Sequence, residues 1–229
     1  MQTASKNSES KRTARITAIC YLLLAITGVL GFLIYHPQIF IPSDTAKTVE
    51  NLMQKSTATQ IRILLEMGII VSQALTAVYF YKLFKKIDQW AAWSLGIWGS
   101  LNAMIILISA IAMASAFQIA NLGYDESSKI MMVALFTSIS TNAWAMGSLF
   151  FGLWLIPMCY IIISSKCMPF ALGYTLILGG LGYILSIVMA YTGWAGSGTE
   201  YLTIPASIGE FWIIGYMLIF GIRTEVHRK

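Results

Sequence analysis

Six long runs of apolar residues, separated by short polar or turn-forming segments, dominate the pattern of this sequence. Each run reaches the roughly 20 residues that a helix needs to cross the hydrocarbon core of a bilayer. Because hydrocarbon offers the backbone no hydrogen-bond partners, each run is predicted to be an α-helix and not a strand. The predicted spans are 16–35, 61–84, 90–120, 130–163, 170–191 and 204–222. The pattern therefore predicts an all-α fold, a polytopic bundle of six transmembrane helices.

The predicted organisation is a basic N-terminal tail (1–15), a six-helix transmembrane domain (16–222) and a basic C-terminal tail (223–229). The first apolar run follows a basic segment, as in a signal peptide. However, it is as long as a full span and no small-residue cleavage site follows it, so we predict a retained helix. The runs 90–120 and 130–163 are longer than one span requires. Neither contains a polar turn, so each is predicted to be one tilted helix and not two.

The distribution of Lys and Arg predicts the orientation. If the N-terminus is cytoplasmic, only four of the 15 Lys and Arg residues fall on the outer side, namely Lys47, Lys55, Arg62 and Lys129. Positive residues favour the cytoplasmic side. We therefore expect both termini in the cytoplasm.

Composition supports a lipid bilayer as the surrounding medium and excludes some functions. The chain is 57% hydrophobic and 11% charged, whereas soluble domains carry about 25% charged residues. Its net charge of +5 lies in short loops and tails and forms no basic face, so no nucleic-acid partner is predicted. No familiar phosphate loop or zinc motif occurs.

Three stretches resemble a known family. The opening "KRTARITAICYLLLAITGVLGFLI", the loop "IPSDTAKTVENL" and the later "FFGLWLIPMCYIIISSKCMPFALGYTLILGGLGYIL" are similar to hallmark segments of a bacterial integral-membrane family. That family is known as domain of unknown function 4386. The resemblance spans about residues 10–225 and implies the same six-helix fold. It implies no activity and no catalytic residue.

Ionisable residues inside predicted spans are rare and costly, and they mark candidate sites. Arg62 and Glu66 lie near the outer end of the second span, and Glu210 lies at a similar depth in the sixth. His36 ends the first span on the same side, and Gln73 shares the helix face of Glu66. The functional interpretation is an outward-facing polar pocket that binds a ligand through these five residues. In the simpler interpretation, Arg62 extends to the membrane surface and pairs only with Glu66, while Gln73 bonds to a neighbouring helix.

Small and aromatic residues indicate close packing. Gly179, Gly182 and Ser186 form a small-residue face in the fifth span, which favours a helix–helix partner. Three tryptophans lie deep in predicted spans, where packing is favoured over lining a cavity: Trp98, Trp144 and Trp154.

Three functional classes remain open. The leading hypothesis is a non-enzymatic protein that binds, senses or transports a small amphiphile or ion. One alternative is an intramembrane lipid-modifying enzyme that uses Glu66 or Glu210 as acid or base. The other is a structural partner of a membrane complex. With only two histidines, the sequence favours no metal site, and neither a cofactor nor a catalytic set is predicted.

Overall fold

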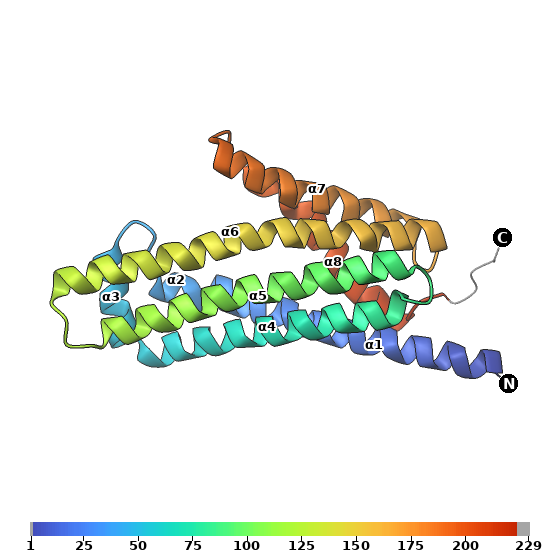
Figure 1. Cartoon of the computed structure of the whole chain (residues 1–229), viewed down its shortest axis with the longest axis horizontal. Coiled ribbons are helices and arrows are strands. Elements are labelled where there is room, and N and C mark those ends of the chain that lie inside the picture. Colours follow the sequence, from blue (N-terminus) through green and yellow to red (C-terminus); the bar gives the residue numbers. More distant parts are fainter. Residues whose placement is uncertain (1, 224–229) are drawn as a thin grey trace. The chain divides into compact units, whose positions relative to one another are not determined.

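The structure, a computed structural model, describes residues 2–223, with side chains from residue 8 onward. The predicted C-terminal tail beyond Arg223 lies outside the described residues. Helices account for all regular structure in the described range, and no strand occurs there (Figure 1). The elements are α1 (Gln2–Val29), the π-helix η1 (Leu30–Tyr35), α2 (His36–Ile39), α3 (Thr45–Gln54), α4 (Ser56–Phe84), α5 (Gln89–Ala120), α6 (Glu126–Ser165), α7 (Phe170–Thr192), the 3₁₀ helix η2 (Thr199–Thr203) and α8 (Ile204–Ile219).

Six helical segments in the described range are long and apolar enough to cross a membrane. They are Ser8–Ile39, Ser56–Phe84, Gln89–Ala120, Glu126–Ser165, Phe170–Thr192 and Thr199–Ile219. Each of them overlaps one predicted span, which confirms the all-α, six-span prediction. The first helix also runs back through the basic segment, since α1 begins at Gln2.

The longest helix is unbroken. α6 contains 40 residues and continues through Pro157, which lies inside it. At 1.5 Å per residue it extends about 60 Å, twice the thickness of a bilayer core. The long fourth run is therefore one helix, as its lack of a polar turn predicted.

The outer surface of α4 is typical of a helix in lipid. A stripe of large apolar side chains is exposed: Leu64, Met67, Val71, Leu75 and Val78. The opposite stripe is buried and mostly polar or charged: Arg62, Glu66, Ile69, Gln73 and Thr76. A soluble helix shows the reverse arrangement, so α4 matches an apolar solvent on the outside.

The chain divides into two compact units, which are described separately below. The first unit comprises Met1–Leu22, Gln73–Asn102 and Gly147–Lys229, and the second comprises Leu23–Ser72 and Ala103–Met146. Four helices, α1, α4, α5 and α6, contribute residues to both units.

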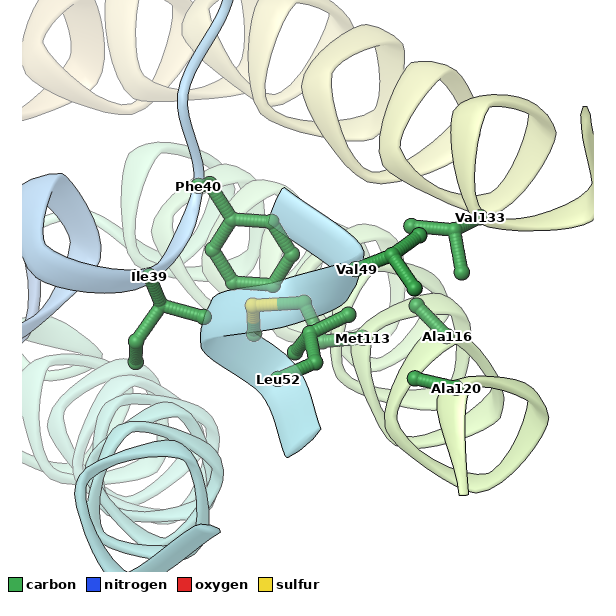
Figure 2. Close-up of a cluster of buried hydrophobic side chains, with 8 residues drawn as sticks. All are labelled: Ile39, Phe40, Val49, Leu52, Met113, Ala116, Ala120 and Val133. Atoms are coloured by element: carbon green, nitrogen blue, oxygen red, sulfur yellow. The ribbon is translucent and has the colours of Figure 1, made fainter. Parts of the chain in front are cut away.

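In the second unit, the loop after the first span folds into α3. The carboxylate of Asp44 caps this helix by accepting a hydrogen bond from the backbone N–H of Lys47 at 2.8 Å. One face of α3 packs into an apolar cluster with side chains from the end of α2, from α5 and from α6 (Figure 2). Figure 2 shows these side chains pointing toward one another: Ile39, Phe40, Val49, Leu52, Met113, Ala116, Ala120 and Val133.

In the first unit, glycines allow α7 to approach its neighbours closely. A Cβ atom on Gly179 would collide with the backbone of Ala206, and one on Gly182 would collide with the carbonyl group of Leu202. On another side, Gly180 of α7 faces Gly152 of α6. The predicted small-residue face thus contacts η2 and α8 of the same chain. A partner outside the chain remains a prediction.

Candidate functional site

The five predicted site residues are divided between the two units. Arg62, Glu66 and His36 belong to the second unit, while Gln73 and Glu210 belong to the first. Each group is therefore considered with its own partners.

The second unit contains a buried ion pair. Nη1 of Arg62 donates to Oε2 of Glu66 at 2.7 Å, and the exposed fractions of the two side chains are 1% and 0%. The pair is one helical turn apart on α4, where i and i+4 side chains lie on the same face. Because α4 begins at Ser56 and not at Ile61, Glu66 lies about 15 Å along the helix. The guanidinium therefore stays inside the unit and does not extend to its surface.

Two further helices donate to the same carboxylate. Oε1 of Glu66 accepts hydrogen bonds from the hydroxyl of Ser109 on α5 at 2.7 Å and from the indole Nε1 of Trp144 on α6 at 2.8 Å. The Ser109 hydroxyl also shares a hydrogen bond with Ser140 at 2.8 Å. Glu66 thus receives donors from α4, α5 and α6, an arrangement that fixes its orientation.

The guanidinium of Arg62 is only partly used by this network. Its Cζ atom lies 4.7 Å from the centre of the Phe32 ring, within the range of a cation–π contact. Gly31 leaves room beside it, since a Cβ there would lie 3.4 Å from Nη1. However, Nε and Nη2 are buried and have no hydrogen-bond partner in the part of the chain that the structure describes. Two donors of a buried cation therefore lack the hydrogen bonds that such a group normally makes.

A π-helix carries the aromatic ring that lies beside Arg62. The segment Leu30–Tyr35 forms η1, and π-helical turns often occur at functional sites. The ring of His36, directly after η1, lies 5.9 Å from the Phe32 ring and 4.8 Å from the Phe40 ring, measured between centres. Its Nδ1 atom is buried without a hydrogen-bond partner among the described residues. His36 therefore belongs to the aromatic stack that begins under Arg62.

In the first unit, Glu210 has a different partner. Its Oε1 accepts a hydrogen bond from the hydroxyl of Tyr21 at 2.6 Å. The Tyr21 ring stacks on Trp154, with 5.7 Å between ring centres. Gln73 donates to the carbonyl of Gly99 at 3.4 Å, and a Cβ on Gly99 would lie 3.4 Å from the Trp154 ring. Glu210 and Gln73 are thus connected, through Tyr21, Trp154 and Gly99, in a second polar cluster.

Several buried polar side chains of the first unit lack partners among the described residues. Oε1 of Gln73 and Nε1 of Trp154 are buried without a hydrogen bond, and so are both polar atoms of the Asn102 side chain, when only the described residues are considered. A buried amide without partners is costly, so each of these groups would gain a hydrogen bond from a polar molecule that reached it.

Sequence reasoning missed Ser109, Ser140, Phe32 and Tyr21 as site residues, and it interpreted Trp144 as a packing residue. One signal was available, because Ser109 lies seven residues after Asn102 and shares its helix face. The others are ordinary serine and aromatic residues, whose roles depend on tertiary contacts. No group of three metal-ligating side chains occurs in the described residues.

The apolar outer surface, the six spans and the buried charges define a polytopic α-helical membrane protein. Within this class, a family model described as "Domain of unknown function (DUF4386)" matches residues 16–221, so the chain belongs to that family. This confirms the resemblance that the sequence motifs predicted. The chain matches no curated protein and no solved structure.

Proposed function

We propose that this chain is a non-enzymatic, multi-pass protein of the bacterial cell membrane that binds, senses or transports a small amphiphile or ion. Its site is proposed around Arg62 and Glu66, on the outer side of the membrane. The observation that carries the proposal is the open edge of the Arg62 guanidinium, where Nε and Nη2 are buried and lack hydrogen-bond partners among the described residues.

The stereochemistry of arginine indicates the class of ligand. A guanidinium is planar, and its Nε–H and Nη2–H groups point the same way along one edge. That edge matches the two oxygens of a carboxylate or a phosphate, which it binds through two parallel hydrogen bonds. The ligand is therefore proposed to carry a carboxylate or phosphate group on an apolar body, since the apolar ring of Phe32 lies 4.7 Å from Cζ of Arg62.

Charge balance adds a second expectation. Arg62 and Glu66 neutralise each other, so an anion on Arg62 would leave one negative charge in apolar surroundings, which is costly. We therefore expect a proton to bind together with the anion.

The proposal is tested by binding of defined amphiphiles to the purified full chain in lipid nanodiscs. Dodecanoate and dodecyl phosphate serve as probes, and methyl dodecanoate serves as the uncharged match. We expect the wild type to bind at least one of the two anionic probes, and the methyl ester about tenfold more weakly or worse, because one bidentate pair supplies more than about 1.4 kcal/mol. If the wild type binds all three probes with similar affinity, this result alone contradicts the proposal.

A pair of variants locates the site. Arg62→Lys keeps the charge but removes the planar fork, so binding of the anionic probe should fall about tenfold or more. Arg15→Lys is the matched control, because Arg15 is exposed and belongs to the first unit. If both variants bind like the wild type, Arg62 is not the anchor.

A specific observation sharpens the enzyme alternative. Glu66 already accepts three hydrogen bonds, whereas Glu210 accepts one from the described residues, from the hydroxyl of Tyr21. If the protein is a lipid-modifying enzyme, Glu210 with Tyr21 is the better acid–base candidate. The test compares the lipid profiles of three strains: wild type, Glu210→Gln and a deletion of the whole gene. If the deletion changes the profile and Glu210→Gln does not, Glu210 is excluded as the acid or base.

A further inference from the structure

A basic cleft lies in the first unit, where α1 faces the end of α4. It has a volume of about 150 Å³. Lys82, Lys85 and Lys86 line it from the end of α4 and the following turn, and Glu9, Ser10 and Thr13 line it from α1. Three ammonium groups therefore face one carboxylate and two hydroxyl groups.

The lysines of this cleft are available for a ligand. All three are exposed, and none forms an ion pair with another described residue. Ammonium groups and hydroxyl groups are both hydrogen-bond donors, and together they suit the oxygens of a phosphate group. The excess of positive charge favours an anion over a neutral ligand.

Aromatic residues place the cleft at the level of lipid headgroups. Nζ of Lys85 lies 5.6 Å from the centre of the Tyr81 ring, and that ring lies 5.1 Å from the ring of Trp93, centre to centre. Trp90 is 85% exposed. Tyr, Trp and Lys together are typical of the boundary between hydrocarbon and headgroups.

An apolar hollow continues from these rings along α5. Its volume is about 580 Å³, and it is lined by Gln89, Trp90, Trp93 and Ile97. Lys85 lines the basic cleft and contacts Tyr81, which packs on Trp93 of the hollow. The basic cleft and the apolar hollow are thus joined by a continuous chain of contacts.

We propose that this surface binds one anionic phospholipid, with its phosphate in the basic cleft and an acyl chain along the hollow on α5. The continuity of the two surfaces favours a phospholipid over free phosphate, which would use only the cleft. The site lies in the first unit and is independent of Arg62 and of the function proposed above.

The test uses quenching of tryptophan fluorescence in vesicles that contain the full chain. Two kinds of vesicle are compared, and both consist mainly of phosphatidylcholine. In one kind the minor, brominated lipid is phosphatidylglycerol, and in the other it is phosphatidylcholine. The bromine is on the acyl chains in both. Bromine quenches a nearby indole, so we expect stronger quenching by the brominated anionic lipid. This excess should disappear in the Trp90→Phe/Trp93→Phe variant, and its persistence there would overturn the position of the acyl chain.

Two triple variants test the cleft. Lys82→Gln/Lys85→Gln/Lys86→Gln should lower the relative affinity for the anionic lipid by about tenfold or more, since each lysine near such a headgroup contributes about fivefold. Lys11→Gln/Lys166→Gln/Arg223→Gln removes the same charge from residues of the first unit that do not line the cleft, and it should keep most of the preference. Equal losses in both variants would show a general charge effect and overturn the site.

Inorganic phosphate distinguishes a phospholipid from a soluble ligand. Added at matched ionic strength, it should leave the excess quenching unchanged, because free phosphate gains nothing from the apolar hollow. If it abolishes the excess, the cleft is a site for soluble phosphate and the proposal is wrong. All six substituted cations are exposed, so both triple variants are expected to fold.

Discussion

The hydroxyl of Ser109 donates a 2.7 Å hydrogen bond to Glu66, 43 residues earlier in the chain, and so joins α5 to α4 inside the second unit. The same carboxylate holds Arg62 on α4 and Trp144 on α6. In apolar surroundings a carboxylate with three donors is strongly oriented, because each donor would lose its partner if the group turned away. Glu66 therefore holds the Arg62 guanidinium through Nη1, whereas Nε and Nη2 have no hydrogen-bond partner among the described residues.

The buried pair should respond to the loss of one charge more strongly than to the loss of both. Glu66→Gln keeps an oxygen for Ser109 and Trp144 but leaves the Arg62 charge without its partner. We expect it to lower the free energy of unfolding by about 3–5 kcal/mol, and the double variant Arg62→Met/Glu66→Gln to recover most of that loss. Titration with SDS in mixed micelles measures both values.

The matched control for this pair is Glu50→Gln on α3. Glu50 pairs with Lys47 at 2.8 Å, but both side chains are about half exposed, so its substitution should change stability little. If the double variant is as unstable as the sum of the two single variants, the pair does not act as a unit.

The sequence predicts the helices and the charge pair, because both depend on local information. Apolar runs set the spans, and a spacing of four places Arg62 beside Glu66. The donors from Ser109 and Trp144 lie 43 and 78 residues away from Glu66, and only tertiary packing brings them together. The π-helix that places Phe32 under Arg62 has no recognisable sequence signal either, since "LGFLIY" is an ordinary apolar run.

The position of Glu66 along its helix also differs from the prediction, for a similar reason. The sequence pattern starts the second span at the first long apolar run, Ile61, whereas α4 begins at Ser56 through a polar segment. Helix starts depend on capping and on packing against neighbours, which hydrophobicity alone does not report. This shift of five residues moves Glu66 about 7.5 Å farther from the helix start.

Ser109→Ala should destabilise the second unit, because it removes a buried donor from Glu66 and a partner from Ser140. We expect a loss of about 1–3 kcal/mol in the free energy of unfolding. Ser94→Ala is the control on the same helix, since the hydroxyl of Ser94 donates an exposed hydrogen bond to the carbonyl of Trp90 one turn earlier. Equal effects of the two substitutions would contradict a special role for Ser109.

The start of α6 should show a stability that depends on pH. Asp125 accepts hydrogen bonds from the backbone N–H and the hydroxyl of Ser128, at 2.9 and 2.8 Å, and these bonds lower the pKa of its carboxyl below the usual 3.8. A lowered pKa in the folded state stabilises the protein above the unfolded pKa. That contribution is lost as the pH falls through the folded pKa.

The wild type should therefore unfold at a higher temperature than Asp125→Ala at neutral pH, and the difference should shrink as the pH falls below about 4. Thermal unfolding in detergent at a series of pH values measures this difference. If the difference in unfolding temperature between the wild type and Asp125→Ala grows on acidification, Asp125 does not stabilise the protein as a capping carboxylate.

Gly182→Ala tests whether the small-residue face of α7 serves the fold or an outside partner. A Cβ at this position would meet the carbonyl of Leu202, a backbone group that cannot turn away as a side chain can. We expect a loss of about 1–3 kcal/mol or more in the free energy of unfolding. Gly215→Ala on α8 is the matched control, because nothing lies within 4 Å of its added Cβ, and it should be neutral or stabilising by up to about 1 kcal/mol. If Gly182→Ala instead leaves stability unchanged but shifts the oligomeric state in size-exclusion chromatography, this face binds another protein and not η2 and α8.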